Sequence, residues 1–281
     1  MSLMTESRGG VTPQVKRVAE MEKLDEEKLR RLVAEGRVVI PFNPIHSPKP
    51  VAIGEGCRVK VNANVGTSPG NVDIAEEEEK VRVALRYGAD AVMDLSIGGD
   101  LDEIRRRLLR IVDLPFGSVP IYQAGIEAAR KKGAVVDMTE DDMFNAFEKH
   151  GKQGIDFVVA HCGVTRESVE RLKRQGRLVD MVSRGGAFHA AWIIHNNEEN
   201  PIYKNFDYLL ELAKEYDLTL SLGDGMRSGA VYDANDRAKI QELLIIGELV
   251  ERARKAGAVS YTHLRAHETR HDIVFRLLLE K

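Results

Sequence analysis

Short apolar runs alternate with longer amphipathic segments along most of this chain. The runs lie at residues 58–65, 90–95, 119–122, 156–161, 179–183 and 218–222. Several end in a polar residue and a glycine, as in VKVNANVG, FVVAHCG and LTLSLGDGMR. An apolar run that stops at such a turn is typical of a buried parallel strand, which delivers side chains to the carboxyl edge of a sheet. We therefore predict six parallel strands.

The segments between the runs carry helix signals. Asp100 precedes one helical pattern and has Glu103 three residues after it, which is the spacing of a capping box. Thr139 and Thr165 precede two further patterns, and Asn235 precedes the longest, which ends at Gly257. In this last helix the spacing predicts a buried stripe of Ile240, Leu243, Leu244, Gly247 and Val250.

A strand followed by a helix, repeated six times, predicts parallel βα units, because parallel strands need a crossover between them. The polar residues at the predicted strand ends lie 22 to 41 residues apart, which suits βα units of a barrel. We expect an α/β fold of the (β/α)8 TIM-barrel type. A doubly wound open sheet is the alternative, but no G-x-G-x-x-G follows the first strand.

The pattern divides the chain into three parts. Residues 1–52 predict a lead-in with one helix and the proline-rich connector PFNPIHSPKP, and residues 53–258 predict a partial barrel. Residues 259–281 form an atypical tail, in which AVSYTH (258–263) is the one strand-like stretch. We expect the barrel to be truncated after about six of its eight units. Unpaired strand edges would then favour partial folding or aggregation.

Composition narrows the classes of function. The formal net charge is −3, which gives no overall basic field for nucleic acid. We interpret the arginine run 105–107 as a solvated helix face. The two cysteines, Cys57 and Cys162, exclude a disulfide framework and a local thiolate site. No apolar leader or membrane-length run is present, so we expect a cytoplasmic protein.

Two arginines follow predicted strand ends beside glycines. Arg184 lies in SRGG and Arg227 in DGMR. Glycine-rich turns expose backbone N–H groups to an anion, and a guanidinium adds a forked donor, so we predict phosphate binding. The alternative is pairing with a nearby carboxylate such as Asp224.

Other polar residues at the same edge suggest contacts with an uncharged ligand. His161 ends a strand and suits either ligand binding or packing, whereas Cys162 suits packing better than nucleophilic attack. Asn62 and Asn64 share one strand face and suit a heterocycle or a ribose hydroxyl; the alternative is that they form a turn.

Three histidines in the tail have helical spacing. His263, His267 and His271 lie at i, i+4 and i+8, which could hold zinc on one face of a helix. We assign no metal site to them, because they lie where the repeating pattern breaks.

Several longer phrases together resemble one family. They are VKVNANVGTSP, ADAVMDLSIGGDL, VPIYQA, SRGGAF with HNNEENPIY, and YDLTLSLGDGMRSGAVYDANDRA. These phrases resemble phosphomethylpyrimidine synthase, the radical enzyme that makes the thiamine pyrimidine. The resemblance implies a (β/α)8 barrel that converts 5-aminoimidazole ribonucleotide to 4-amino-5-hydroxymethyl-2-methylpyrimidine phosphate. It also implies a radical S-adenosylmethionine lyase that is homodimeric at full length.

The resemblance also implies substrate contacts, carried over motif by motif, but it identifies no catalytic residue. The implied contacts are Asn64, Met93, Tyr122, His161, Ser183, Arg184, Gly185, Asp224, Gly225, Met226 and Arg227. Met93 by itself suits barrel core.

The chain departs from the family pattern after Ala258. The family uses a [4Fe-4S] cluster, S-adenosylmethionine and zinc. Its Glu-Gly-Pro-Gly-His segment, zinc-binding histidines and three-cysteine motif are not found here. A cluster needs thiolate ligands, so we expect this chain to be inactive alone. The alternatives are a non-catalytic nucleotide-binding fragment, or a radical-free barrel lyase that acts on a phosphosugar.

Overall fold

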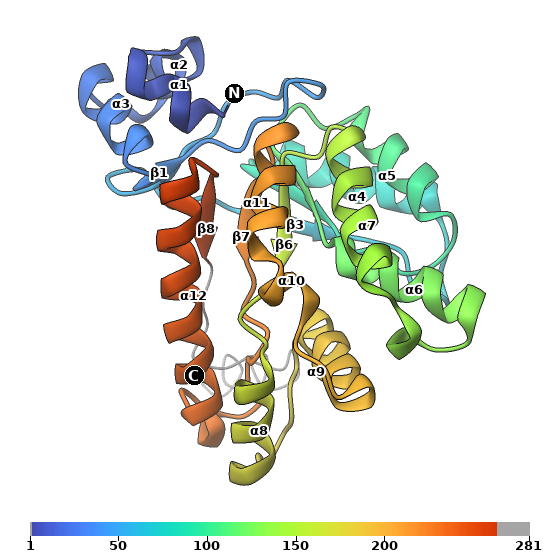
Figure 1. Cartoon of the computed structure of the whole chain (residues 1–281). Coiled ribbons are helices and arrows are strands. Elements are labelled where there is room, and N and C mark those ends of the chain that lie inside the picture. The colour runs from blue at the N-terminus through green and yellow to red at the C-terminus, as the bar shows by residue number, and fades with distance from the viewer. Residues whose placement is uncertain (1, 263–281) are drawn as a thin grey trace, which may run out of the picture.

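The computed structural model describes residues 2–262. Its centre is a parallel sheet whose strands are ordered as they occur in the chain (Figure 1). These strands are β3 (Asn62–Val65), β4 (Ala91–Asp94), β5 (Phe116–Ser118), β6 (Phe157–Ala160), β7 (Thr219–Leu222) and β8 (Ser260–Thr262). The predicted α/β class and parallel sheet are confirmed. Residues 2–262 do not include the further two strands that a closed eight-stranded barrel needs.

Two of the six predicted strands are wrong. Residues 119–122 do not form a strand but begin α6 (Pro120–Lys132), and the strand lies just before them, at β5. Pro120 is the first residue of this helix, where its fixed φ and missing N–H cost nothing. Tyr122 therefore lies on the first turn of a helix and not at a strand end.

Residues 179–183 are the second error. β6 pairs directly with β7, so no strand lies between them. Instead, Met181 forms an isolated bridge with Ser228, and this segment lies against the loop after β7. Val179, in this run, is 43% exposed, so the apolar run marks no buried strand. The sixth strand is β8, in the stretch AVSYTH.

The predicted helix starts are largely confirmed. The Asp100 carboxylate accepts from Glu103 N at the start of α5 (Leu101–Leu109). Thr139 and Thr165 cap two later helices in the same way. The helices that they cap are α7 (Glu140–Lys152) and α8 (Arg166–Gln175). The remaining helices of the sheet region are α4 (Ile74–Arg86), α9 (Arg184–Asn196), α10 (Pro201–Lys204), α11 (Phe206–Glu215) and α12 (Arg237–Ala256).

Helix α12 differs from its prediction in two ways. Its cap is Asp236, because Asn235 adopts a left-handed conformation with φ of 55°. The predicted stripe is also on the wrong face, since Leu244 is 61% exposed. The buried residues are Ala238, Lys239, Glu242, Ile245, Ile246, Leu249 and Ala253. The predicted stripe counted apolar residues alone, whereas the buried face also includes the charged residues Lys239 and Glu242.

Residues 2–57 form a small unit with its own hydrophobic cluster. It contains α1 (Leu3–Gly9), α2 (Pro13–Glu22), α3 (Glu26–Ala34) and an antiparallel pair, β1 (Val38–Val39) and β2 (Ile53–Gly54). It lies at the end of the sheet opposite α8 and α9 (Figure 1). Asn43 N donates to the carboxylate of Asp156 at the start of β6, which ties this unit to the amino ends of the strands.

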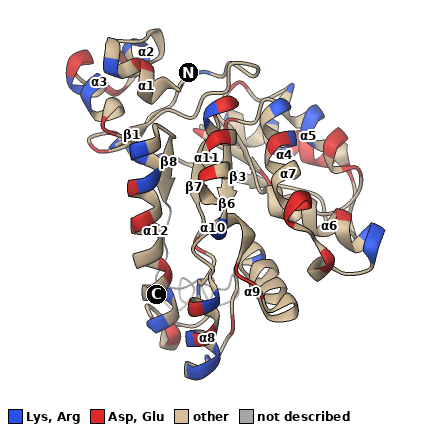
Figure 2. Cartoon of the chain, in the orientation of Figure 1, with Lys and Arg blue, Asp and Glu red and all other residues tan. Residues whose placement is uncertain are grey.

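Charges are mixed on the outer helices (Figure 2). The arginine run is only partly a solvated face, because Arg105 is 3% exposed and donates to Gln123 and Gln153. Within the part of the chain described here, no helix is both long and apolar enough to cross a membrane.

Candidate ligand site at the carboxyl edge of the sheet

The imidazole of His161 lies at the centre of the candidate site. It follows β6 and is buried between two glycines. A Cβ added to Gly185 would lie 2.2 Å from its Cε1, and one added to Gly223 would lie 2.8 Å from its Cδ2. Both contacts are too short for a side chain. Glycine at these positions is therefore what lets both turns close around the ring.

The SRGG and DGMR turns lie against each other. A Cβ on Gly186 would lie 2.1 Å from the carbonyl oxygen of Gly225. Val182 N donates to Arg227 O at 3.1 Å. The Ser183 hydroxyl caps α9 by accepting from Gly186 N at 3.2 Å. Two segments about 40 residues apart in sequence thus form one rim beside His161.

Arg184 and Tyr122 meet across this rim. Arg184 is the exposed first residue of α9, and its Cζ lies 5.1 Å from the centroid of the Tyr122 ring. Burial raises the pKa of Tyr122, against the opposing effect of the Arg184 and Arg227 charges. The phenol is thus protonated at neutral pH, with two guanidinium groups near it.

His161 is neutral at physiological pH. Burial, together with the charge of Arg227, lowers its pKa to about 3. Among the residues described, nothing hydrogen-bonds to its buried Nδ1. The ring of His189 lies 6.3 Å away, and burial likewise lowers its pKa to about 3. A neutral imidazole with one uncommitted nitrogen can donate to or accept from an uncharged ligand.

Asn62, Asn64 and Met93 form a second cluster at the same edge. The Asn62 amide donates to Asn64 Oδ1 at 3.2 Å, and it lies 3.8 Å from Met93 Sδ. Asn64 and Met93 are also register partners on β3 and β4. Both asparagines are exposed, whereas Met93 is half-buried. The shared face predicted for the asparagines is confirmed, and Met93 borders it.

The backbone donors of the DGMR turn are occupied by the protein itself. Gly225 N and Met226 N donate to the Glu242 carboxylate, at 2.7 and 2.9 Å. Asp224 forms an ion pair with Lys239. The idea that this glycine turn offers these two N–H groups to a ligand is therefore wrong. The missed residues lie on α12, and the spacing D-x-x-K-x-x-E (236–242) was the available signal.

The cysteines do not suit an iron–sulfur cluster. Cys162 is fully buried, and burial raises its pKa to about 12. Cys57 lies in the small N-terminal unit, and burial raises its pKa too. Residues 2–262 contain no group of three or more His, Cys, Asp or Glu side chains placed to hold a metal ion. His263, His267 and His271 lie outside the described residues.

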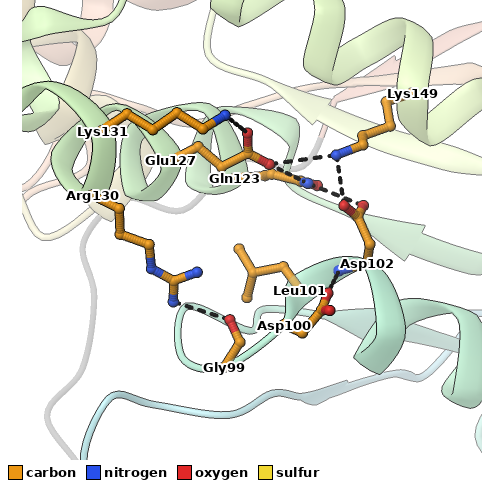
Figure 3. Close-up of a pocket in the computed structure, with 9 residues that line it drawn as sticks. All are labelled: Gly99, Asp100, Leu101, Asp102, Gln123, Glu127, Arg130, Lys131 and Lys149. Atoms are coloured by element: carbon orange, nitrogen blue, oxygen red, sulfur yellow. Dashed lines mark hydrogen bonds and ion pairs between the residues drawn. The ribbon is translucent and has the colours of Figure 1, made fainter.

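A separate pocket of 570 Å³ lies between α5, α6 and α7 (Figure 3). Its basic residues already have partners: Lys149 bonds to Asp102 at 2.6 Å, Lys131 to Glu127 at 3.0 Å, and Arg130 to Gly99 O at 3.0 Å. Acidic and basic groups balance around the pocket, which gives it no net attraction for an anion. None of the predicted site residues lines it.

Comparison with known proteins gives one consistent family. The model of the Radical SAM ThiC family matches residues 2–275. Phosphomethylpyrimidine synthase of Methanocaldococcus jannaschii is 56% identical over 258 residues, which cover 92% of this chain and 61% of that protein. The protein of the same name from Pyrococcus furiosus is 58% identical over 259 residues, covering 92% and 60%. This chain thus spans about three fifths of the length of these relatives.

Similarity to solved structures is weak. Dihydropteroate synthase of Yersinia pestis aligns with 82% of this chain and 93% of its own, at 12% identity and a TM-score of 0.26. That score is too low to bear on fold or function.

Proposed function

Because this chain belongs to the Radical SAM ThiC family, with relatives named phosphomethylpyrimidine synthase, we propose that it carries the nucleotide-binding part of such an enzyme. The proposed ligand is 5-aminoimidazole ribonucleotide. In the complete enzyme the product is 4-amino-5-hydroxymethyl-2-methylpyrimidine phosphate, on the route to thiamine. The observation that supports this most is the rim formed by the SRGG and DGMR turns around neutral His161.

Each part of this ligand has a chemically suitable partner. Arg184 and Arg227 would bind the phosphate through their guanidinium groups, which suit its geometry and charge. His161 Nδ1 would hydrogen-bond to the imidazole or the ribose. Asn64 would bind a hydroxyl through its exposed amide, and Met93 would give an apolar contact.

Radical SAM membership implies S-adenosylmethionine and a [4Fe-4S] cluster. A cluster is held by several thiolates, whereas this chain has two cysteines, one of them buried with a raised pKa. We therefore assign no step of the reaction to a cluster held by these residues. Our proposal for the chain alone is binding without turnover.

Calorimetry with 5-aminoimidazole ribonucleotide tests the proposal. We expect the chain to bind it and Arg227→Ala to weaken binding at least about tenfold, since hydrogen bonds to charged groups contribute this much. Arg174→Ala, an exposed arginine on α8, is the matched control and should bind like the unmodified chain. Absence of binding by the unmodified chain would reject the function. Product formation by the chain with iron, reductant and S-adenosylmethionine would reject the claim of no turnover.

A further inference from the structure

Helix α12 hydrogen-bonds to the backbone of the DGMR turn through Glu242. The Glu242 carboxylate accepts from Gly225 N at 2.7 Å and from Met226 N at 2.9 Å. Glu242 is fully buried, and a Cβ on Gly163 would lie 2.7 Å from its Cγ, so the side chain has little room to move. The carboxylate therefore fixes two successive peptide groups immediately before Arg227.

Lys239 of α12 and Asp236, which caps this helix, also help to hold the same turn. Lys239 pairs with Asp224, and Asp236 pairs with Arg177 at 2.6 Å. Arg177 in turn donates to Met226 O at 2.7 Å. Residues three positions apart on a helix are neighbours, so Lys239 lies between Asp236 and Glu242 at the start of α12. Each residue from 224 to 226 is thus held by at least one buried charge.

The DGMR turn is also hydrogen-bonded to the segment that leads into the SRGG turn. Arg227 O accepts from Val182 N, one residue before Ser183 caps α9. Fixing the DGMR backbone therefore also constrains the start of α9, where Arg184 lies. Two arginines that must meet one phosphate gain affinity when their backbones are fixed in advance, because less freedom is lost on binding.

We propose that Glu242 is a positioning residue of the nucleotide site: as an internal anion it occupies Gly225 N and Met226 N, fixes Arg227, and leaves the ligand phosphate to the guanidinium groups. This inference rests on the proposed function. Glu242 does not touch the ligand in this arrangement. Its carboxylate takes the place that a phosphate takes in glycine-rich turns whose N–H groups are free.

The ionisation of Glu242 gives the inference a second readout. Burial raises its pKa to about 7, while its bonds to Met226 N and Gly225 N and the charges of Lys239 and Arg177 oppose this rise. The groups facing it are Lys239 on its own helix, Arg177 just after α8, and Cys162 after β6. A protonated carboxyl is a weaker acceptor for two N–H groups. The turn should therefore loosen as pH falls through the pKa of Glu242.

Binding by variants tests the inference. In calorimetry with 5-aminoimidazole ribonucleotide, we expect Glu242→Gln to weaken binding about tenfold, because the amide nitrogen cannot accept the second N–H. The matched control is Glu248→Gln, an exposed position on the same helix, which should leave affinity unchanged. If the unmodified chain binds and Glu242→Gln binds equally well, the inference is wrong. If the unmodified chain fails to bind, the proposed function is wrong instead.

A spectroscopic measurement tests the inference without a ligand. With ¹⁵N-labelled glycine and methionine, the amide signals of Gly225 and Met226 should titrate together near neutral pH in the unmodified chain. The same signals should stay constant in Glu242→Gln. Signals that do not move with pH in the unmodified chain would overturn the inference, even if the variant failed to fold.

Discussion

The Arg184 guanidinium lies over the ring of Tyr122, with its Cζ 5.1 Å from the ring centroid. Arg184 begins α9 and Tyr122 lies in the first turn of α6, so this contact joins two helix starts at the carboxyl edge of the sheet. A cation over an aromatic face is stabilised by the ring quadrupole. The contact orients an arginine that the proposed function assigns to the phosphate.

This contact predicts a graded series of variants at one position. Tyr122→Phe keeps the ring and should bind 5-aminoimidazole ribonucleotide better than Tyr122→Leu, which removes the aromatic face. We expect Tyr122→Leu to weaken binding about three- to tenfold, as a cation–π contact of about 0.5–1 kcal/mol or more implies. Calorimetry measures the difference. Equal affinities for the Phe and Leu variants would show that the ring face does not orient Arg184.

The strand ends that were predicted correctly are those that a local sequence pattern marks. At β4, β6 and β7, an apolar run stops at a polar or glycine-rich turn, and this pattern reports burial within the run itself. The run at β3 ends at such a turn too, although only Val65 of this strand is buried. Asn64, His161 and Asp224 were therefore assigned to the correct edge. Arg227 was assigned to this edge for the same reason, whereas Arg184 was assigned there from residues 179–183, which form no strand.

Several of the errors involve partners that are distant in sequence. The run 179–183 reads as apolar, yet it packs against the loop that follows β7. No local pattern in the sequence predicts this contact. The buried face of α12 carries Lys239 and Glu242 because Asp224 and the DGMR backbone require them. The buried Arg105 donates to Gln123 and Gln153 through its two terminal nitrogens. Apolar periodicity cannot identify a polar side chain whose burial depends on such partners.

Close packing at the rim predicts that glycine is required there. In Gly186→Ala the new methyl would lie 2.1 Å from Gly225 O, a backbone atom that cannot rotate away. We expect the free energy of unfolding to fall by about 1–3 kcal/mol, the usual cost of overpacking. Denaturant unfolding followed by circular dichroism measures it.

Gly247 provides the control for Gly186→Ala. Gly247→Ala changes an exposed position of α12 where an added Cβ meets nothing within 4 Å. It should stabilise the chain by about 0.5–1 kcal/mol, because alanine favours a helix over glycine. Stability of Gly186→Ala equal to that of Gly247→Ala would contradict the packing of the two turns.

The environments of the two thiols predict different reactivity. Cys162 is fully buried and its pKa is raised to about 12, so its thiol is neither accessible nor ionised at neutral pH. In Cys57→Ser, which leaves Cys162 as the one cysteine, we expect no reaction with a disulfide reagent until the protein is unfolded. Cys162→Ser should react at half-buried Cys57 under native conditions. Rapid native labelling of Cys162 would contradict its assignment to packing.

The small N-terminal unit is held to the sheet by a buried histidine–carboxylate pair. His46 Nδ1 lies 2.7 Å from Asp156 Oδ2, and the Asp156 carboxylate also accepts from Asn43 N and Phe116 N. Burial alone would lower the pKa of His46, but the hydrogen bond to Asp156 and its charge outweigh burial and raise it. The charged imidazole is therefore favoured in the folded state over the unfolded state.

A raised histidine pKa makes stability fall as pH rises. The contribution of His46 is fully present below its ordinary pKa of about 6.5 and is lost as pH passes its raised value. Between about pH 6 and about pH 9 we expect the free energy of unfolding to decrease in the unmodified chain and to decrease less in His46→Gln. His195→Gln, at an exposed histidine of α9, should retain the full decrease. Denaturant titrations at both pH values measure this, and an identical decrease in His46→Gln would contradict the pairing.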